Sequence, residues 1–266
     1  MIFSKYSPNN GSSRMNHAGD IQNSREVYLK GTNRNLNWLL RSRFVWMNNY
    51  IEFEHIGLEL GSGIAASKDF IKCKNFACSD FLDSIWLDIK NIDALDPGFP
   101  DDRFDFIIVS NTIHHLAFPK KFFQEAHRIL KPGGKLIIQD IYTSFLMRVL
   151  LRVTKHEGYN ETINVYSEQI PCNELYDPWS ANCSIPKLLF KYKDKFEVEL
   201  PNWEIIHRKN VEFLSFANSG GVIAKTNYIK LGQKLLAMQD SIDKLLCWAL
   251  PEVFSLQIQI VLMKKY

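Results

Sequence analysis

The sequence predicts an α/β fold in which a mostly parallel sheet carries helices on both faces. Along residues 55–140, short apolar segments with the length of buried strands alternate with turns and an amphipathic helical segment. A glycine-rich turn directly follows the first of these strands. Strands that alternate with helices pair in parallel, because each crossover returns the chain to the same end of the sheet.

The first predicted helix covers residues 35–51. Its apolar residues recur with helical spacing, which indicates one buried face. They are Leu36, Leu39, Leu40, Met47 and Ile51. Residues 1–34 are predicted to form a polar arm, and residues 35–266 a single domain.

Three short apolar segments predict buried strands at residues 55–60, 75–80 and 104–109. A further strand is expected before Asp93, so that residues 104–109 form the fourth strand along the chain. Pro119–Leu130 follows as an amphipathic helix, because proline suits the first turn and the apolar residues form one stripe. Lys131-Pro-Gly-Gly134 ends that helix, and residues 135–140 predict the next strand.

The regular alternation stops after residue 140. Residues 141–200 contain several prolines and many aromatic and polar residues, which predicts an irregular insertion packed over the site. A strand at 203–216 and a helix at about 228–250 follow. Residues 254–263 alternate between apolar and polar side chains, as a half-exposed or edge strand does.

The composition indicates a soluble, cytoplasmic globular protein. The net charge is +3, from 32 basic and 29 acidic residues, which gives no reason to expect a nucleic-acid partner. No apolar run approaches the ~20 residues that span a bilayer, and we expect no signal peptide. The five cysteines have irregular spacing, which favours reduced thiols over disulfides or a zinc site: Cys73, Cys78, Cys172, Cys183 and Cys247.

Two features together predict a ligand that contains adenosine. The turn Gly61-Ser62-Gly63-Ile64-Ala65-Ala66 lies between a predicted strand and a predicted helix, and its glycines allow a ligand to approach the backbone. Asp80 follows 19 residues after Gly61, where a carboxylate can accept both ribose hydroxyls. The alternative is a purely structural glycine turn.

S-adenosylmethionine and NAD both contain adenosine, so the choice between them depends on two further acidic residues. Glu59 lies two residues before Gly61, where it would repel a pyrophosphate but attract the ammonium group of a methionine. Its alternative role is to cap a backbone N–H. Asp93 can accept a hydrogen bond from the adenine amino group, or make a local turn.

Several motifs in series resemble the class I S-adenosylmethionine-dependent methyltransferases of the methyltransferase-11 type. The similarity covers roughly residues 55–140. The motifs are Glu59-Leu-Gly-Ser-Gly63, Asp93-Ala94, Phe99-Pro-Asp-Asp-Arg-Phe-Asp105, Ser110-Asn-Thr-Ile-His-His-Leu116 and Arg128-Ile-Leu-Lys-Pro-Gly-Gly134.

This resemblance implies a Rossmann-like, doubly wound sheet of seven strands with an antiparallel last strand, and S-adenosylmethionine as the cofactor. It places Glu59 and Gly61-Ser62-Gly63 beside the methionine moiety, and Asp80 at the ribose. It places Asp93 and Ala94 beside the adenine, and Ser110 and Asn111 against the cofactor from the fourth strand.

The sequence departs from the family pattern at two points. Ala66 replaces the third glycine, and only 13 residues separate Asp80 from Asp93, so the helix expected there is short or absent. The short connection at 79–88 and Asp177-Pro-Trp-Ser-Ala-Asn182 resemble members encoded among surface-polysaccharide functions. That similarity implies a saccharide acceptor.

Four residues are candidates for the catalytic side chains. His114 and His115 follow the fourth strand, at the carboxyl edge where sites form in such sheets. Asp140 ends the fifth strand, and His156 precedes Glu157 in the insertion. A hydroxyl acceptor needs a general base, and each of these residues can serve as one. The alternatives are a packed or capping histidine, a helix-capping aspartate and a solvated loop histidine. No metal-ligand spacing stands out, so the sequence predicts metal-independent transfer.

Residues 142–153 are apolar with two arginines between them. Such a helix can contact a membrane surface or a lipid tail, and the alternative is a lid packed on the sheet.

The leading functional hypothesis is O-methylation of a saccharide or glycosylated precursor. A quinone or another small lipid-like acceptor is the second. An NAD-dependent oxidoreductase and a non-catalytic S-adenosylmethionine-binding module are the hypotheses from other classes.

Overall fold

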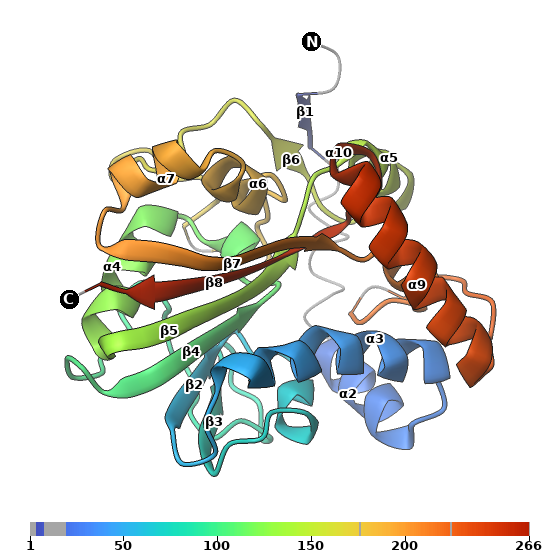
Figure 1. Cartoon of the computed structure of the whole chain (residues 1–266), viewed down its shortest axis with the longest axis horizontal. Helices are drawn as coiled ribbons and strands as arrows, with labels where there is room; N and C mark the ends of the chain where they lie inside the picture. Colours follow the sequence, from blue (N-terminus) through green and yellow to red (C-terminus); the bar gives the residue numbers. More distant parts are fainter. Residues whose placement is uncertain (1–3, 8–19, 176, 224, 266) are drawn as a thin grey trace.

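The computed structural model describes residues 4–7, 20–175, 177–223 and 225–265. Its centre is a six-stranded sheet with the order β3-β2-β4-β5-β8-β7 (Figure 1). The strands are β2 (Ile56–Leu60), β3 (Asn75–Ser79), β4 (Phe104–Ser110), β5 (Leu130–Ile141), β7 (Trp203–Val211) and β8 (Gln257–Lys264). β3, β2, β4 and β5 pair in parallel, whereas β8 is antiparallel to β5 and β7. The predicted Rossmann-like α/β fold is confirmed.

The main sheet has six strands where the family resemblance implied seven. Within the described residues, the strand expected before Asp93 is replaced by a single bridge between Ser79 and Ile89. A parallel crossover needs a dozen or more residues, and usually a helix, before the next strand. The 13-residue separation between Asp80 and Asp93 is too short for both.

One face of the sheet is covered by α4 (Pro119–Ile129), α6 (Ile185–Phe190) and α7 (Lys193–Glu199) (Figure 1). The predicted apolar stripe of α4 is buried against this face: Phe122, Phe123, Ala126 and Ile129. Ile107 and Val109 of β4 point into the same core, as every second residue of a strand does.

The opposite face is covered by α2 (Asp20–Lys30) and α3 (Arg34–Val45), and α3 continues into a 3₁₀ helix at Trp46–Tyr50. Asn33 caps α3, because its side chain accepts a hydrogen bond from the Leu36 N–H at 3.1 Å. Phe106 and Ile108, the alternate residues of β4, point into this second core.

Part of the predicted polar arm is a packed helix. Ile21 and Tyr28 of α2 are buried in the core beneath α3. Further toward the N-terminus, β1 (Lys5–Tyr6) pairs antiparallel with β6 (Tyr159–Asn160) of the insertion. Residues 1–3 and 8–19 of the predicted arm lie outside the described residues.

The prediction that residues 254–263 form a half-exposed or edge strand was wrong. β8 lies between β5 and β7, and its first six residues are buried. The polar residues that suggested solvent exposure are two buried glutamines, which bond to other side chains. Gln257 Nε2 donates to Asn111 Oδ1 at 2.8 Å, and Gln259 Nε2 donates to Gln139 Oε1 at 3.2 Å.

The insertion after β5 contains α5 (Phe145–Thr154), β6, α6 and α7. Beyond β7, the chain forms α8 (Leu214–Ala217), α9 (Gln233–Ala249) and α10 (Pro251–Phe254). Asp243 of α9 holds the start of α8, because its carboxylate accepts the N–H groups of Phe213, Leu214 and Ser215. No helix within the described residues has both the length and the apolar character required to cross a bilayer.

Candidate active site

A cavity of about 620 Å³ opens at the carboxyl ends of β2, β3 and β4. This volume lies within the ~300–1,000 Å³ typical of pockets for small ligands and cofactors. Its wall includes every residue predicted to contact the cofactor: Glu59, Gly61, Ser62, Gly63, Asp80, Asp93, Ala94, Ser110 and Asn111. The structure therefore brings these residues together around one space, and their individual roles remain predictions.

The glycine-rich turn forms one side of this cavity. Gly61 and Gly63 have φ values of +75° and +52°, in the left-handed region that favours glycine. A Cβ atom on Gly61 would lie 2.3 Å from Thr112 Oγ1, so the turn also packs tightly on the loop after β4. The helix expected after this turn is only a 3₁₀ turn, Ala66–Asp69, because the chain returns to the sheet at Asn75.

Asp80 connects the ends of β2 and β3. Its Oδ2 accepts the Gly63 N–H at 2.8 Å, and its Oδ1 accepts the Leu82 N–H at 3.0 Å. Each carboxylate oxygen keeps a second lone pair. The arrangement therefore fixes the carboxylate at the cavity wall and leaves it able to accept ribose hydroxyls.

Glu59 lies at the end of β2 and is 1% exposed. Its carboxylate accepts hydrogen bonds from the Ser67 hydroxyl and, at 3.4 Å, from the Cys78 thiol. Burial raises the pKa of Glu59, and these hydrogen bonds only partly offset that effect. A cation in the cavity would stabilise the ionised form, as the ammonium group of a methionine moiety would.

Asp93 and Ala94, which were predicted to flank the adenine, lie in a loop after β3, whereas Ser110 is the last residue of β4 and Asn111 follows it. Asp93 Oδ1 accepts the Leu95 N–H at 2.8 Å, so this aspartate makes the local turn as well as lining the cavity. Asn111 has a φ of +53°, and its side-chain oxygen is occupied by Gln257. Ser110 and Asn111 thus border the cavity from the end of β4.

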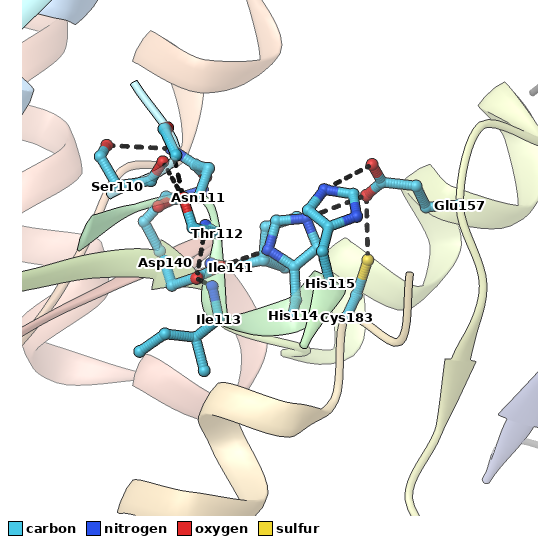
Figure 2. Close-up of polar contacts among 12 residues, drawn as sticks. Ser110, Asn111, Thr112, Ile113, His114, His115, Asp140, Ile141, Glu157 and Cys183 are labelled. Atoms are coloured by element: carbon cyan, nitrogen blue, oxygen red, sulfur yellow. Dashed lines mark hydrogen bonds and ion pairs between the residues drawn. The ribbon is translucent and has the colours of Figure 1, made fainter. Parts of the chain in front are cut away.

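The same cavity wall contains His114, His115, His156 and Glu157, which together are named the histidine cluster. His114 and His115 lie on a 3₁₀ turn, Ile113–His115, directly after β4. Glu157 comes from the insertion, and Figure 2 shows its carboxylate facing both imidazole rings. His156 Nε2 lies 3.5 Å from Glu157 Oε1.

The prediction that Asp140 acts directly on an acceptor needs correction. Asp140 is fully buried and is not part of the cavity wall. Its Oδ2 accepts the N–H groups of Thr112 and Ile113, and its Oδ1 lies 2.5 Å from His114 Nδ1 (Figure 2). Asp140 therefore positions the loop and the His114 ring.

Burial and the neighbouring charges move the pKa values of His114 and His115 in opposite directions. Burial alone would lower the pKa of His114, but the carboxylates of Asp140 and Glu157 raise it to about 10. Burial and the adjacent His114 lower the pKa of His115 to about 4. Burial opposes ionisation of Glu157, yet the neighbouring histidines hold its pKa well below the ordinary value.

The sequence did not predict which apolar residues form the walls of the cavity. Leu39, Leu40 and Phe44 of α3 form one wall, and Met147, Leu150 and Leu151 of α5 form part of another. The periodicity of these segments predicted helices with a buried face but not what each face covers. The sequence also gave no signal for the buried ion pair beside the cavity, in which Arg43 Nη2 lies 2.8 Å from Glu212 Oε2.

Comparisons with known proteins place the site in a family context. Residues 56–138 match the family model described as a methyltransferase domain. An uncharacterized protein of Methanocaldococcus jannaschii is 30% identical over 103 residues, which cover 38% of this chain and 50% of that protein. A demethylmenaquinone methyltransferase of Renibacterium salmoninarum is 32% identical over 85 residues, which cover 28% of this chain. The matched segments span only half and 36% of these two relatives.

The fold is similar to that of an S-adenosylmethionine-dependent methyltransferase from Archaeoglobus fulgidus. The TM-score is 0.54 at 14% identity, and the match covers 85% of this chain and 93% of that one. The family-model match ends at residue 138, so it includes Glu59, Asp80 and the histidines at 114 and 115 but not Glu157. Residues 56–138 are therefore similar to a methyltransferase domain, and the fold is similar to that of an S-adenosylmethionine-dependent methyltransferase.

Proposed function

We propose that this protein transfers a methyl group from S-adenosylmethionine to an oxygen of a small acceptor. The observation that carries the proposal is one cavity whose wall contains two sets of functional side chains. One set comprises the acids predicted to bind a sulfonium nucleoside, and the other is the histidine cluster. A cofactor and an acceptor held in this space would be brought into line for reaction.

The cofactor would lie along the ends of β2, β3 and β4. Glu59 would pair with its ammonium group, and Asp80 would accept its ribose hydroxyls. Asp93 and Ala94 would flank the adenine. Gly61-Ser62-Gly63 would pass beneath the methionine moiety, with Ser110 and Asn111 opposite. These assignments follow from the family resemblance and from the shared cavity wall.

The reaction is a displacement at a methyl group that the sulfonium already activates. Positioning the acceptor and excluding water supply most of the acceleration in such a step. The acceptor oxygen would be held at the histidine cluster, which offers imidazole and carboxylate atoms within the cavity wall. His114, His115 and His156 are the candidate catalytic residues. Asp140 would position the His114 ring.

A saccharide or glycosylated precursor is the first acceptor to test. The segment from Asp177 to Asn182, which resembles enzymes of surface-polysaccharide functions, contributes to the cavity region. Asp177, Pro178 and Trp179 all line the cavity. The ring of Trp179 offers an aromatic surface of the kind that packs against apolar ligand faces.

A quinone or other lipid-like molecule is the second candidate acceptor, and α5 favours it. One side of α5 lines the cavity through Met147, Leu150 and Leu151. Phe145, Val149 and Val153 on the same helix are exposed. This pattern suits a helix that contacts a membrane surface while an apolar acceptor enters beside it. Absence of co-sedimentation with anionic liposomes at low salt would remove the membrane contact.

Transfer of a radiolabelled methyl group tests the proposal. The protein is incubated with labelled S-adenosylmethionine and either a glycosylated or a quinol-containing acceptor pool, and Asp80→Ala serves as the negative control. Label in the glycosylated pool supports the first acceptor class, and label in the quinol pool supports the second. Cofactor binding without label in any pool would indicate a binding module. Calorimetric binding of NAD in place of S-adenosylmethionine would indicate an oxidoreductase.

A further inference from the structure

Three side chains of the histidine cluster that can bind a metal ion lie close to one another. His114 Nε2 lies 3.7 Å from Glu157 Oε2, and His115 Nε2 lies 4.0 Å from Glu157 Oε1. All three groups offer an atom within 4.8 Å of the others. We propose that His114, His115 and Glu157 bind a divalent transition-metal ion in the wall of the cavity. This site goes beyond the proposed methyl transfer and differs from the sequence expectation of metal independence.

In both imidazole rings Nδ1 is engaged in a hydrogen bond, so Nε2 is the atom that can bind a metal ion. His114 Nδ1 lies 2.5 Å from the Asp140 carboxylate, and His115 Nδ1 lies 3.0 Å from the Ser180 carbonyl oxygen. Both partners only accept hydrogen bonds, so each Nδ1 carries the hydrogen. In a neutral ring, the lone pair is then on Nε2, which is the tautomer that binds a metal.

Hydrogen bonds hold Asp140 and the backbone of His114 in place behind the proposed ligands. Besides His114, the Asp140 carboxylate accepts the N–H groups of Thr112, Ile113 and Ile141. The carbonyl oxygen of His114 accepts the Asn182 N–H and the Asn173 side-chain amide, each at 2.9 Å. A carboxylate behind a ligating histidine is a common outer-shell arrangement in metal sites.

The spacing suits a small divalent ion after a modest closure. Metal–nitrogen and metal–oxygen bonds of about 2.0–2.2 Å place tetrahedral ligand atoms about 3.4 Å apart. The observed separations of 3.7 and 4.0 Å exceed this value by about 0.3 and 0.6 Å. Two imidazoles and one carboxylate suit Zn²⁺, Fe²⁺ or another first-row ion rather than Mg²⁺ or Ca²⁺.

Three protein ligands leave a coordination position open, as in catalytic metal sites. All three proposed ligands line the cavity, so this position would face the acceptor. If the proposed function holds, a hydroxyl oxygen bound there would have a lowered pKa and would release its proton to water. The oxygen–carbon bond would then form as the sulfur–carbon bond breaks, which leaves a methyl ether and a neutral thioether.

Metal binding to the full chain tests this site without reference to activity. The purified protein is stripped with a chelator and dialysed, and Co²⁺ is titrated as the probe while its visible absorption is followed. We expect one ion per chain, with absorption that reports nitrogen and oxygen ligands. Zn²⁺ should displace the Co²⁺, since affinity for zinc exceeds that for cobalt in the usual order.

Two variants remove one ligand each. Glu157→Gln and His115→Ala should weaken Co²⁺ binding by at least about tenfold, and Asp140→Asn by about 10–100-fold, the range for outer-shell partners. The matched control is His55→Gln, because His55 Nε2 and Glu52 Oε2 form a similar pair at 3.6 Å and neither residue lines the cavity. This variant should bind Co²⁺ as the unmodified protein does.

Three results would overturn the metal site: no stoichiometric binding to the unmodified protein, unchanged binding in folded Glu157→Gln and His115→Ala, or equal loss in His55→Gln. Titration of S-adenosylhomocysteine in the presence of the chelator is carried out in parallel. Binding of that nucleoside without metal binding would refute only the metal site. Metal binding without the nucleoside would instead refute the proposed function.

Discussion

The buried carboxylate of Asp140 lies 2.5 Å from His114 Nδ1 and simultaneously accepts the N–H groups of Thr112 and Ile113. One side chain at the end of β5 thus fixes both the backbone after β4 and the ring that the loop presents to the cavity. This contact links the Rossmann-like sheet to the histidine cluster. It also explains why Asp140 is unsuited to touch an acceptor.

Substitution of Asp80 should weaken cofactor binding. In Asp80→Ala, we expect the affinity for S-adenosylhomocysteine to fall by about 1–3 kcal/mol, the range for lost hydrogen bonds to a charged group. Isothermal titration calorimetry measures the change. Asp83→Ala is the control, since Asp83 forms an exposed ion pair with Lys90 at 2.8 Å. Equal affinities in Asp80→Ala and the unmodified protein would count against the ribose assignment.

Cofactor affinity should depend on pH through Glu59. Burial and, to a smaller extent, the Asp80 charge raise the pKa of Glu59 above 4.5, while the Ser67, Ser62 and Cys78 contacts lower it. An ammonium group binds the ionised carboxylate, so affinity should rise as the pH increases through that raised pKa. The increase should begin above the ordinary glutamate pKa, in a range where the ligand's amino group is still charged.

The Glu59→Gln variant isolates this effect, because glutamine keeps the shape and cannot ionise. We expect weaker binding at pH 8 and a flatter pH profile in calorimetric titrations. A pH profile that is the same in Glu59→Gln and the unmodified protein would assign the dependence to another group.

The Asp105 carboxylate should make stability fall in acid. Partial burial raises the pKa of Asp105, but hydrogen bonds from Lys131 Nζ and the Ile56 N–H lower it overall. A lowered folded-state pKa contributes stability above the ordinary aspartate value, and that stability is lost as the pH falls through the folded pKa. We therefore expect the loss below about pH 4.

Asp105→Asn should reduce the free energy of unfolding at pH 7 and flatten its decline in acid. Urea unfolding at a series of pH values measures both. Asp101→Asn is the control, because that carboxylate is exposed and paired with Arg128 at 2.7 Å. An acid dependence as steep in Asp105→Asn as in the unmodified protein would contradict the prediction.

Gly57 is expected to tolerate no side chain. A Cβ atom at this position of β2 would lie 2.0 Å from the Phe106 ring. Gly57→Ala should therefore lower the free energy of unfolding by about 1–3 kcal/mol or more, as overpacked cores do. Gly232→Ala places its Cβ in open space and should cost less than about 1 kcal/mol. Similar urea midpoints for the two variants would refute the close packing.

The central strands were predictable because their sequences are almost continuously apolar. Ile107, Ile108 and Val109 of β4 are fully buried, with alternate residues in different cores, and such a run is typical of a parallel strand that is buried on both faces. The β8 prediction failed for a physical reason. Gln257 and Gln259 look like solvent-facing residues in sequence, yet their amides bond to Asn111 and Gln139 inside the sheet.

The candidate site was predictable only where short-range motifs define it. Glu59, the glycine turn and Asp80 lie at strand ends, and parallel strands bring such ends together. The pairing of His115 with Glu157 was not predictable in the same way. These residues are 42 positions apart in sequence, and the path of the insertion between them brings their side chains together.

The most direct test of the central claim is calorimetric titration of the purified full chain with S-adenosylhomocysteine, with NAD titrated separately. We expect one nucleoside to bind per chain, weaker binding in Asp80→Ala and Glu59→Gln, and no heat of binding with NAD. Absence of S-adenosylhomocysteine binding to the folded protein, or preferential binding of NAD, would contradict the account.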